Sequence, residues 1–385
     1  MFSSLLKRMN PKHCLCIDFG NDENDSEIIE TELDTGILLQ IVPTLLDIIQ
    51  KDSSISSIDW LDKKINSLKT LHELSKNECN RVEMICSNEF ELLEAVTNCI
   101  DCSYDMQSNR ERNQRLDEIR RQSILLLNNL SIPKENKIAM IRHRHFHALL
   151  EKVSNVIRLQ IPEATYLCCI LLMNITLLPE AVEPVIMFTP QNFEQDHTKS
   201  NARQPALLNT SIDAKDWETF ATSRHVTTTR QPTPPRQRGS YGNEIPCLEN
   251  PLSLLRSIEK LMRDQQPFLM SKAFSVEGEG IRWCVGLLRN LTLKNKYCMI
   301  IAQTEIPLFL LGVIRKTRHS VMKWTQDTIE DMSLTVIDQL ASSPAAREKL
   351  KSCGAKNVIN TIDRRECATI KVQNRISSIL EYLDE

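Results

Sequence analysis

Three histidines stand close enough together to suggest a metal site. His143, His145 and His147 alternate with Arg142 and Arg144 in one short run. On a helix only His143 and His147 would share a face, because residues four apart are neighbours there, and no Cys or carboxylate stands at the spacing of a zinc ligand. The two arginines would also repel a cation. We therefore expect no metal, and interpret the run as an exposed turn between helices, with contact to an anion or an acidic partner as the alternative.

The cysteines provide two further pairs with metal-ligand spacing. Cys99 and Cys102 form a Cys-x-x-Cys motif, and Cys14 and Cys16 form a Cys-x-Cys motif. A structural zinc ion needs four ligands, and neither pair has a second pair nearby in sequence. The chain holds 13 cysteines, an odd number, and several stand singly within apolar runs. This distribution favours reduced thiols that pack as small hydrophobic groups, in a protein of the cytoplasm and/or the nucleus.

The common sequence motifs of enzymes are absent. The chain has no Gly-x-Gly-x-x-Gly dinucleotide motif, no phosphate-binding Gly-Lys-Ser/Thr loop and no Gly-x-Ser-x-Gly nucleophile turn. We therefore predict no catalytic residues, no cofactor and no metal, and a protein that is not an enzyme.

The charge balance argues against nucleic acid as the main partner. Lys and Arg number 47 and Asp and Glu number 50, which gives a net charge of −3, whereas phosphate binding usually depends on a basic excess. A local basic strip would keep nucleic-acid binding open as an alternative. Its candidate members are Arg110, Arg112, Arg115, Arg120, Arg121, Arg142 and Arg144.

No membrane-spanning segment is expected. The most apolar run, Ala164–Leu178, has 15 residues, whereas a membrane span needs roughly 20. The apolar stretch within Met1–Gly20 is too short for a signal peptide.

The most informative pattern is an internal repeat. Three five-residue stretches follow the form Leu-x-Asn-Leu/Ile-Ser/Thr, and two weaker ones fit the same frame. Their fourth residues are Leu74, Leu130, Ile175, Leu291 and Leu340. Each stretch closes a segment with apolar residues at helical spacing, and the three clear examples begin at Leu127, Leu172 and Leu288. Five similar stretches in one frame predict a chain of structurally equivalent helical units.

The intervals between these positions indicate where the repeat is irregular. Leu130 and Ile175 are 45 residues apart, and Leu291 and Leu340 are 49 residues apart. The interval of 56 from Leu74 to Leu130 predicts a loop at about residues 101–114. The interval of 116 from Ile175 to Leu291 corresponds to about two units, and it contains a segment rich in Pro, Thr, Gln and Arg. That segment has no apolar stripe, so we predict that it is disordered.

The pattern resembles the armadillo repeat, in which a helix ending in Leu-x-Asn-Leu-Ser/Thr is followed by a short Asn-Lys/Arg helix and an apolar helix. The resemblance covers about residues 60–187 and 250–385, and implies an all-α fold, a right-handed α-solenoid of armadillo-like repeats. Stacking would let each unit cover the apolar face of its neighbour. The expected domains are a flexible N-terminal segment with an acidic tail (1–35), N-terminal repeats (36–187), a disordered insertion (188–250), and C-terminal repeats with a capping helix (251–385).

The Asn of the repeated motif is the candidate partner-binding residue. It stands at Asn129, Asn174 and Asn290, and Glu73 and Gln339 replace it in the weaker stretches. In peptide-binding armadillo proteins such as the importin-α family, an Asn near this position faces the concave groove and bonds the backbone of an extended ligand. The resemblance implies that role here, and the alternative is an Asn that bonds the backbone of the neighbouring repeat.

The chain departs from the importin-α pattern in one respect. The Trp that stands one turn before the Asn in that family is replaced here by Leu125, Ile170 and Gly286. The sequence therefore predicts a non-catalytic scaffold or adaptor that binds a protein or extended peptide on the concave face of a superhelix. A nuclear-transport-type peptide adaptor and a nucleic-acid-binding protein are the alternatives.

Overall fold

The regular structure is helical throughout the described part of the chain. The computed structural model describes residues 35–51, 58–86, 91–100, 110–161, 163–190, 250, 253–265, 276–317, 329–362 and 370–385, and no strand occurs among them. Residues 1–34 and 191–249 lie outside the described residues, and with them lie the predicted acidic tail and almost all of the predicted disordered insertion. The described residues up to Thr189 and those from Asn250 onward belong to one compact unit.

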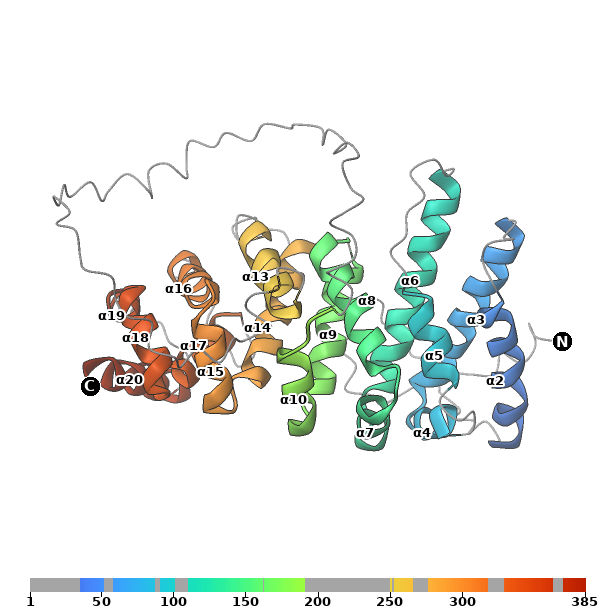
Figure 1. Ribbon diagram of the computed structural model, residues 1–385, viewed down its shortest axis with the longest axis horizontal. Helices are drawn as coiled ribbons and strands as arrows, with labels where there is room; N and C mark the ends of the chain where they lie inside the picture. The colour runs from blue at the N-terminus through green and yellow to red at the C-terminus, as the bar shows by residue number, and fades with distance from the viewer. Residues whose placement is uncertain are drawn as a thin grey trace, which may run out of the picture. The chain divides into compact units, whose positions relative to one another are not determined.

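Figure 1 shows the helices in chain order. Their bounds are α2 Thr35–Gln50, α3 Ile58–Lys76, α4 Glu78–Cys86, α5 Glu91–Asn98, α6 Arg110–Leu130, α7 Lys134–Arg142, α8 Phe146–Leu159, α9 Ala164–Thr176, α10 Pro179–Ile186, α13 Leu254–Gln265, α14 Val276–Leu291, α15 Asn295–Ala302, α16 Ile306–Thr317, α17 Ile329–Ser342, α18 Pro344–Ser352, α19 Ala355–Asn360 and α20 Ile370–Asp384.

Local sequence explains where several of these helices begin and end. α10 and α18 begin with Pro179 and Pro344, whose fixed φ suits the first turn and whose missing N–H needs no partner there. Gly354 precedes α19 with a φ of 75°, a left-handed conformation in which a side chain would be strained. Gln160 adopts a similar conformation, with a φ of 53°, and ends α8.

The five repeated stretches occupy equivalent places in the fold. They form the C-terminal ends of α3, α6, α9, α14 and α17, which we call the leading helices. The residues at the equivalent position are at most 2 % exposed. They are Leu74, Leu130, Ile175, Leu291 and Leu340. All five predicted positions are thus buried at or near the C-terminal end of a helix.

Each leading helix begins a group of three helices in the described residues. The groups are α3–α5, α6–α8, α9 and α10 with α13, α14–α16, and α17–α19. The leading helices pack against one another in order, α3 on α6, α6 on α9, α9 on α14 and α14 on α17. Apolar residues along the leading helices lie in the core that these contacts create. They include Leu68, Leu127, Leu172 and Leu287.

Two expectations about the spacing of the groups were wrong. The interval of 116 residues does not contain two units, because α9 packs directly on α14, and α13 completes the group of α9 by packing on α8 and α14. The sequence between 188 and 250 therefore interrupts a single group. The predicted loop at 101–114 was also wrong for its last residues, because α6 begins at Arg110. The first turns of α6 carry no apolar stripe, and Arg115 ties them to Asp62 of α3.

Terminal helices cover both ends of the described groups. α2 packs on α3, α4 and α5, and α20 packs on α17, α18 and α19. α20 buries Val372, Ile376, Ile379 and Leu383 on one side and exposes polar residues on the other. Such a polar outer face is what a terminal repeat needs.

Among the helices of the described ranges, none by itself combines the length and the apolar character that a membrane span requires. α15 and the adjoining part of α16 meet both conditions only as a pair, with a bend of 85° between them.

Candidate functional site

The predicted partner-binding asparagines join neighbouring leading helices. The side-chain amide of Asn129 on α6 donates to the hydroxyl of Ser75 on α3 at 3.0 Å. The amide of Asn174 on α9 donates to the hydroxyl of Ser131, just after α6, at 3.3 Å. Each bond therefore links the Asn of one group to the Ser that follows the equivalent position in the preceding group.

The same connection continues across the insertion. The amide of Asn290 on α14 donates to the backbone carbonyl of Met173 at 3.0 Å and to the hydroxyl of Thr176 at 3.2 Å. In the last group, the side-chain oxygen of Gln339 accepts a hydrogen bond from the hydroxyl of Thr292. We call these four connections the side-chain ladder.

The ladder brings the three predicted site residues into one line, one on each of three successive leading helices. Asn129 and Asn174 are half-buried, and Asn290 is only 4 % exposed. One amide donor of each is directed at the preceding group. Only Asn290 bonds the backbone there, as the alternative drawn from the sequence expected, whereas Asn129 and Asn174 bond side-chain hydroxyls. The sequence did not identify the Ser and Thr residues as partners of these asparagines, although they occupy the fifth position of the repeated stretches.

A second set of bonds closes the C-terminal ends of the leading helices. Asn80 of α4 donates to the carbonyl of Leu74, and Asn136 of α7 donates to the carbonyl of Leu130, both at 3.0 Å. Asn136 also donates to the carbonyl of Arg81 at 2.8 Å, which links α7 to α4. Helix ends leave backbone carbonyls without intrahelical partners, so these amides satisfy groups that would otherwise be buried unpaired.

Beside the ladder, two leading helices present half-buried apolar side chains. Leu125 of α6 and Ile170 of α9 stand one turn before Asn129 and Asn174, and Tyr166 and Met173 extend the same face of α9. We call Leu125, Tyr166, Ile170 and Met173 the central apolar surface. They pack against the core without being covered by it.

Gly286 of α14 stands where the importin-α pattern has Trp. A Cβ at this position would lie 2.9 Å from Sδ of Met173 and 3.7 Å from Sδ of Met332. Met173 therefore fills the space beside Gly286, and a bulky aromatic group has no room there.

The arginines of the proposed basic strip do not form an open basic surface. Four of the seven are engaged with carboxylates of the chain. Arg115 pairs with Asp62, Arg120 with Asp117, Arg121 with Glu163, and Arg144 with Glu94. Arg120 is also only 1 % exposed. These pairs neutralise most of the positive charge on which nucleic-acid binding would depend.

The histidine run spans the turn between α7 and α8. His143 and His145 lie in the turn, whereas His147 belongs to α8, and all three are half-buried where the sequence predicted an exposed turn. His145 lies 3.0 Å from Glu94, and its backbone N–H donates to the His143 ring at 3.4 Å. His147 lies on α8 against Phe188, with ring centroids 4.9 Å apart. Burial, together with the charges of His145 and Arg144, lowers the pKa of His143. No three metal-ligating side chains meet at one point in the described residues.

The described cysteines are buried in the core or stand as single thiols. Cys99 is buried, and burial raises the pKa of its thiol. Cys169 of α9 and Cys284 of α14 are both fully buried, with their sulfurs 3.4 Å apart. Cys14, Cys16 and Cys102 lie outside the described residues.

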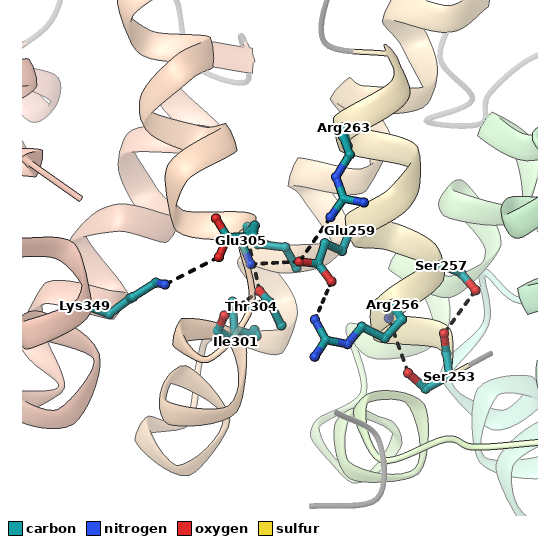
Figure 2. A network of polar contacts seen from close by, with 10 residues as sticks. Ser253, Arg256, Ser257, Glu259, Arg263, Ile301, Thr304, Glu305 and Lys349 are labelled. Atoms are coloured by element: carbon teal, nitrogen blue, oxygen red, sulfur yellow. Dashed lines mark hydrogen bonds and ion pairs between the residues drawn. The ribbon is translucent and has the colours of Figure 1, made fainter. Parts of the chain in front are cut away.

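A buried carboxylate that sequence reasoning missed holds α13 in place (Figure 2). Glu259 is 4 % exposed, and Arg256 approaches it at 2.6 Å and Arg263 at 3.8 Å. Arg256 approaches Oε2, whereas Oε1, which faces Arg263, also accepts the backbone N–H of Glu305 at 2.9 Å, at the start of α16. A helix start favours negative charge, because its first N–H groups lack intrahelical partners.

The same network reaches the groups on either side. Glu305 pairs with Lys349 of α18 at 3.6 Å, and the Ser257 hydroxyl lies 3.1 Å from that of Ser154 on α8. α13 is thus joined to α8 and α16 by polar bonds. Because the carboxylate is already satisfied by its own chain, the network is a means of attachment and not a ligand site.

Comparisons with known proteins show the fold and no more. No family model matches the sequence, and no curated protein matches it. One similar solved structure is described as "A conserved phosphorylation switch controls the interaction between cadherin and beta-catenin in vitro and in vivo". The match has a TM-score of 0.55 and 13 % sequence identity, and covers 90 % of this chain and 54 % of the other. The chain thus spans about half the length of the protein it resembles, and the likeness supports an all-helical fold of the armadillo type.

Proposed function

We propose that this chain is a non-catalytic interaction scaffold or adaptor, in which the three-helix groups are armadillo-like repeats of a right-handed α-solenoid. In this proposal a protein or an extended peptide binds on the concave face, which the leading helices form. The chain then acts in the cytoplasm and/or the nucleus, for which its many singly placed cysteines are the support.

The central apolar surface is the observation that carries the proposal. Leu125, Tyr166, Ile170 and Met173 lie on adjacent helices that the Asn174–Ser131 bond holds together. Partner-binding surfaces typically have an apolar and aromatic centre with polar groups around it. Asn129 and Asn174 provide those polar groups, because both are half-buried and an Asn side chain has two donors and one acceptor.

The ladder gives this surface a fixed geometry. Side chains on adjacent leading helices are held in register by hydrogen bonds between groups, so the surface does not need to order itself when a partner arrives. Less conformational entropy is then lost on binding. The similar solved structure concerns an interaction between cadherin and β-catenin, which agrees with a protein partner for this fold.

The two alternatives receive less support. A nuclear-transport-type adaptor would lack its Trp positions, and Met173 fills the space beside Gly286 where one of them would lie. Nucleic-acid binding would depend on arginines that are already paired with carboxylates, among them Arg115 and Arg121. Titration calorimetry with a basic bipartite peptide tests the first alternative, and we expect no heat of binding.

Site-specific photo-crosslinking tests the proposal itself. A photoreactive amino acid is placed at Leu125 or Ile170 in the intact chain, and at Leu308 of α16 as a control that is 45 % exposed. We expect protein adducts from the first two positions that are absent from the control, with or without residues 188–250. Equal adducts from all three positions would refute a partner site on the leading helices. Adducts to RNA would refute a protein as the partner.

A further inference from the structure

Two buried thiols face each other where α9 packs on α14. Sγ of Cys169 and Sγ of Cys284 are in direct contact at 3.4 Å, and both residues are fully buried. The two cysteines are 115 positions apart and stand on the two sides of the insertion. Single buried cysteines are ordinary in a protein core, but contact between two of them also allows a covalent bond.

Neighbouring contacts hold the two sulfurs in this position. Further along both helices, the amide of Asn290 donates to the Met173 carbonyl, and the Met173 side chain fills the space beside Gly286. α9 and α14 therefore touch at two successive levels, which fixes their register. A disulfide bond is about 2 Å long, so a further approach of about 1.4 Å separates the observed contact from a covalent bond.

The surroundings of the thiols decide which oxidant can reach them. The hydrogen bond with Cys169, together with burial, raises the pKa of the Cys284 thiol well above its usual range. Because the thiolate is the reactive form, the pair stays reduced unless an oxidant persists. Access requires a local opening of the helix pair, which admits a small uncharged molecule more readily than a large charged one. Hydrogen peroxide meets this requirement, whereas oxidised glutathione does not.

We propose that Cys169 and Cys284 form a site of oxidative modification, at which hydrogen peroxide produces a disulfide that locks α9 to α14. The thiolate of one cysteine attacks a peroxide oxygen, the O–O bond breaks, and a sulfenic acid and one water result. The other thiol attacks the sulfenic sulfur, the S–O bond breaks, and a second water leaves. The two thiols thus lose two electrons and two protons, and one peroxide becomes two waters.

A cleavage experiment detects this bond and does not depend on the proposed function. A specific protease site is introduced within residues 191–240 of the full chain, which is treated with peroxide, blocked at its remaining thiols and then cut. On a denaturing gel without reductant, we expect the two fragments to stay linked, and to separate after reduction. Peptide mass spectrometry of the linked band should identify Cys169 joined to Cys284. Oxidised glutathione should give roughly tenfold less of this product.

Variants assign the link to this pair. Cys169→Ala and Cys284→Ala should each abolish the linked band. Cys168→Ala is the matched control, because Cys168 is the preceding residue of α9 and is equally buried, and it should leave the band unchanged. The exposed Cys79 and Cys86 are replaced by serine in every protein, so that they form no other links. Circular dichroism shows whether each variant is folded, and the mass spectrum of the parent protein tests the proposal without them.

Urea unfolding shows whether the bond locks the two helices. Oxidation should raise the unfolding midpoint of the uncut chain by roughly 0.5–1 M, because it closes a long loop in the unfolded chain, and reduction should reverse the rise. An unchanged midpoint in the linked protein would refute the lock. No link after prolonged peroxide treatment, or a link that persists in Cys284→Ala, would refute the site. Equal yields with peroxide and oxidised glutathione would refute peroxide as its preferred oxidant.

Discussion

The side-chain amide of Asn290 and the backbone carbonyl of Met173 form a 3.0 Å hydrogen bond between residues 117 positions apart. This bond joins α14 directly to α9, on the two sides of the insertion. A second contact joins the same pair of helices, because the sulfurs of Cys169 on α9 and Cys284 on α14 lie 3.4 Å apart. The parts of the chain before and after the insertion therefore fold as one body, and disruption of this junction should destabilise both.

We expect Asn290→Ala to lower the free energy of unfolding by about 1–2 kcal/mol, because it removes the two hydrogen bonds of a buried side chain to the Met173 carbonyl and the Thr176 hydroxyl. Asn129→Ala is the comparison, since Asn129 is half-buried and bonds a hydroxyl, and it should cost about 0.5–1 kcal/mol. Urea unfolding measures both. Equal losses of unfolding free energy in the two variants would show that the Asn290 bonds stabilise the fold no more than the Asn129 bond does.

Glu259 should be more important for stability than any exposed carboxylate. Glu259→Ala removes the partner of two arginines and of the Glu305 N–H, and should cost about 3 kcal/mol. Glu259→Gln keeps an acceptor for the N–H and should cost less, about 1–2 kcal/mol. Urea unfolding again gives the values, with the exposed Glu180→Ala expected to change stability by less than about 0.5 kcal/mol. A Glu259→Ala variant as stable as the control would contradict the role of the network in holding α13.

The fold could be predicted because its signal is repeated. Leu130, Ile175 and Leu291 each close an apolar stripe with the same five-residue stretch, and three similar signals in one frame support one another. The spatial place of α13 could not be predicted, because no local pattern shows that residues on either side of a long insertion belong to one group. The contact between Ser154 and Ser257, for example, joins residues 103 positions apart and can be seen only in the folded chain.

The candidate site was predicted only in part. The asparagines could be identified by their position in the repeat, but the direction of their amides could not, since Ser75 and Ser131 belong to neighbouring groups. Glu259 gave no signal, because an acidic residue among basic ones on a helix is usually exposed. Ile132, Leu177 and Leu293 follow the Ser or Thr of the three clear stretches, yet only their exposure distinguishes them from core residues.

Gly286 tests how tightly the space beside Met173 is filled. Gly286→Ala should change stability by less than about 1 kcal/mol, because the gain in helix propensity offsets a shift of the flexible Met173 side chain. Gly286→Leu should cost about 1–3 kcal/mol, because both Met173 and Met332 must move. The double variant Gly286→Leu with Met173→Ala should cost less than the sum of the single changes, which urea unfolding can measure. Simple additivity would show that the two side chains do not compete for the same space.

The last prediction concerns pH, and depends on His72 of α3. Burial lowers the pKa of His72 from 6.5 to about 4, and the nearby positive charges of Lys76 and Arg121 contribute, against an opposing effect of Glu73. Between these two values the unfolded chain binds a proton that the folded chain does not, so stability is complete above pH 6.5 and falls as the pH is lowered toward 4. The full loss from this one group is about 3 kcal/mol. His72→Gln should therefore lose less stability than the wild type when urea unfolding is compared at about pH 7 and about pH 4.5, because the remaining titrating groups are common to both proteins. Parallel losses in the two proteins would mean that His72 takes up its proton equally in the folded and unfolded chains.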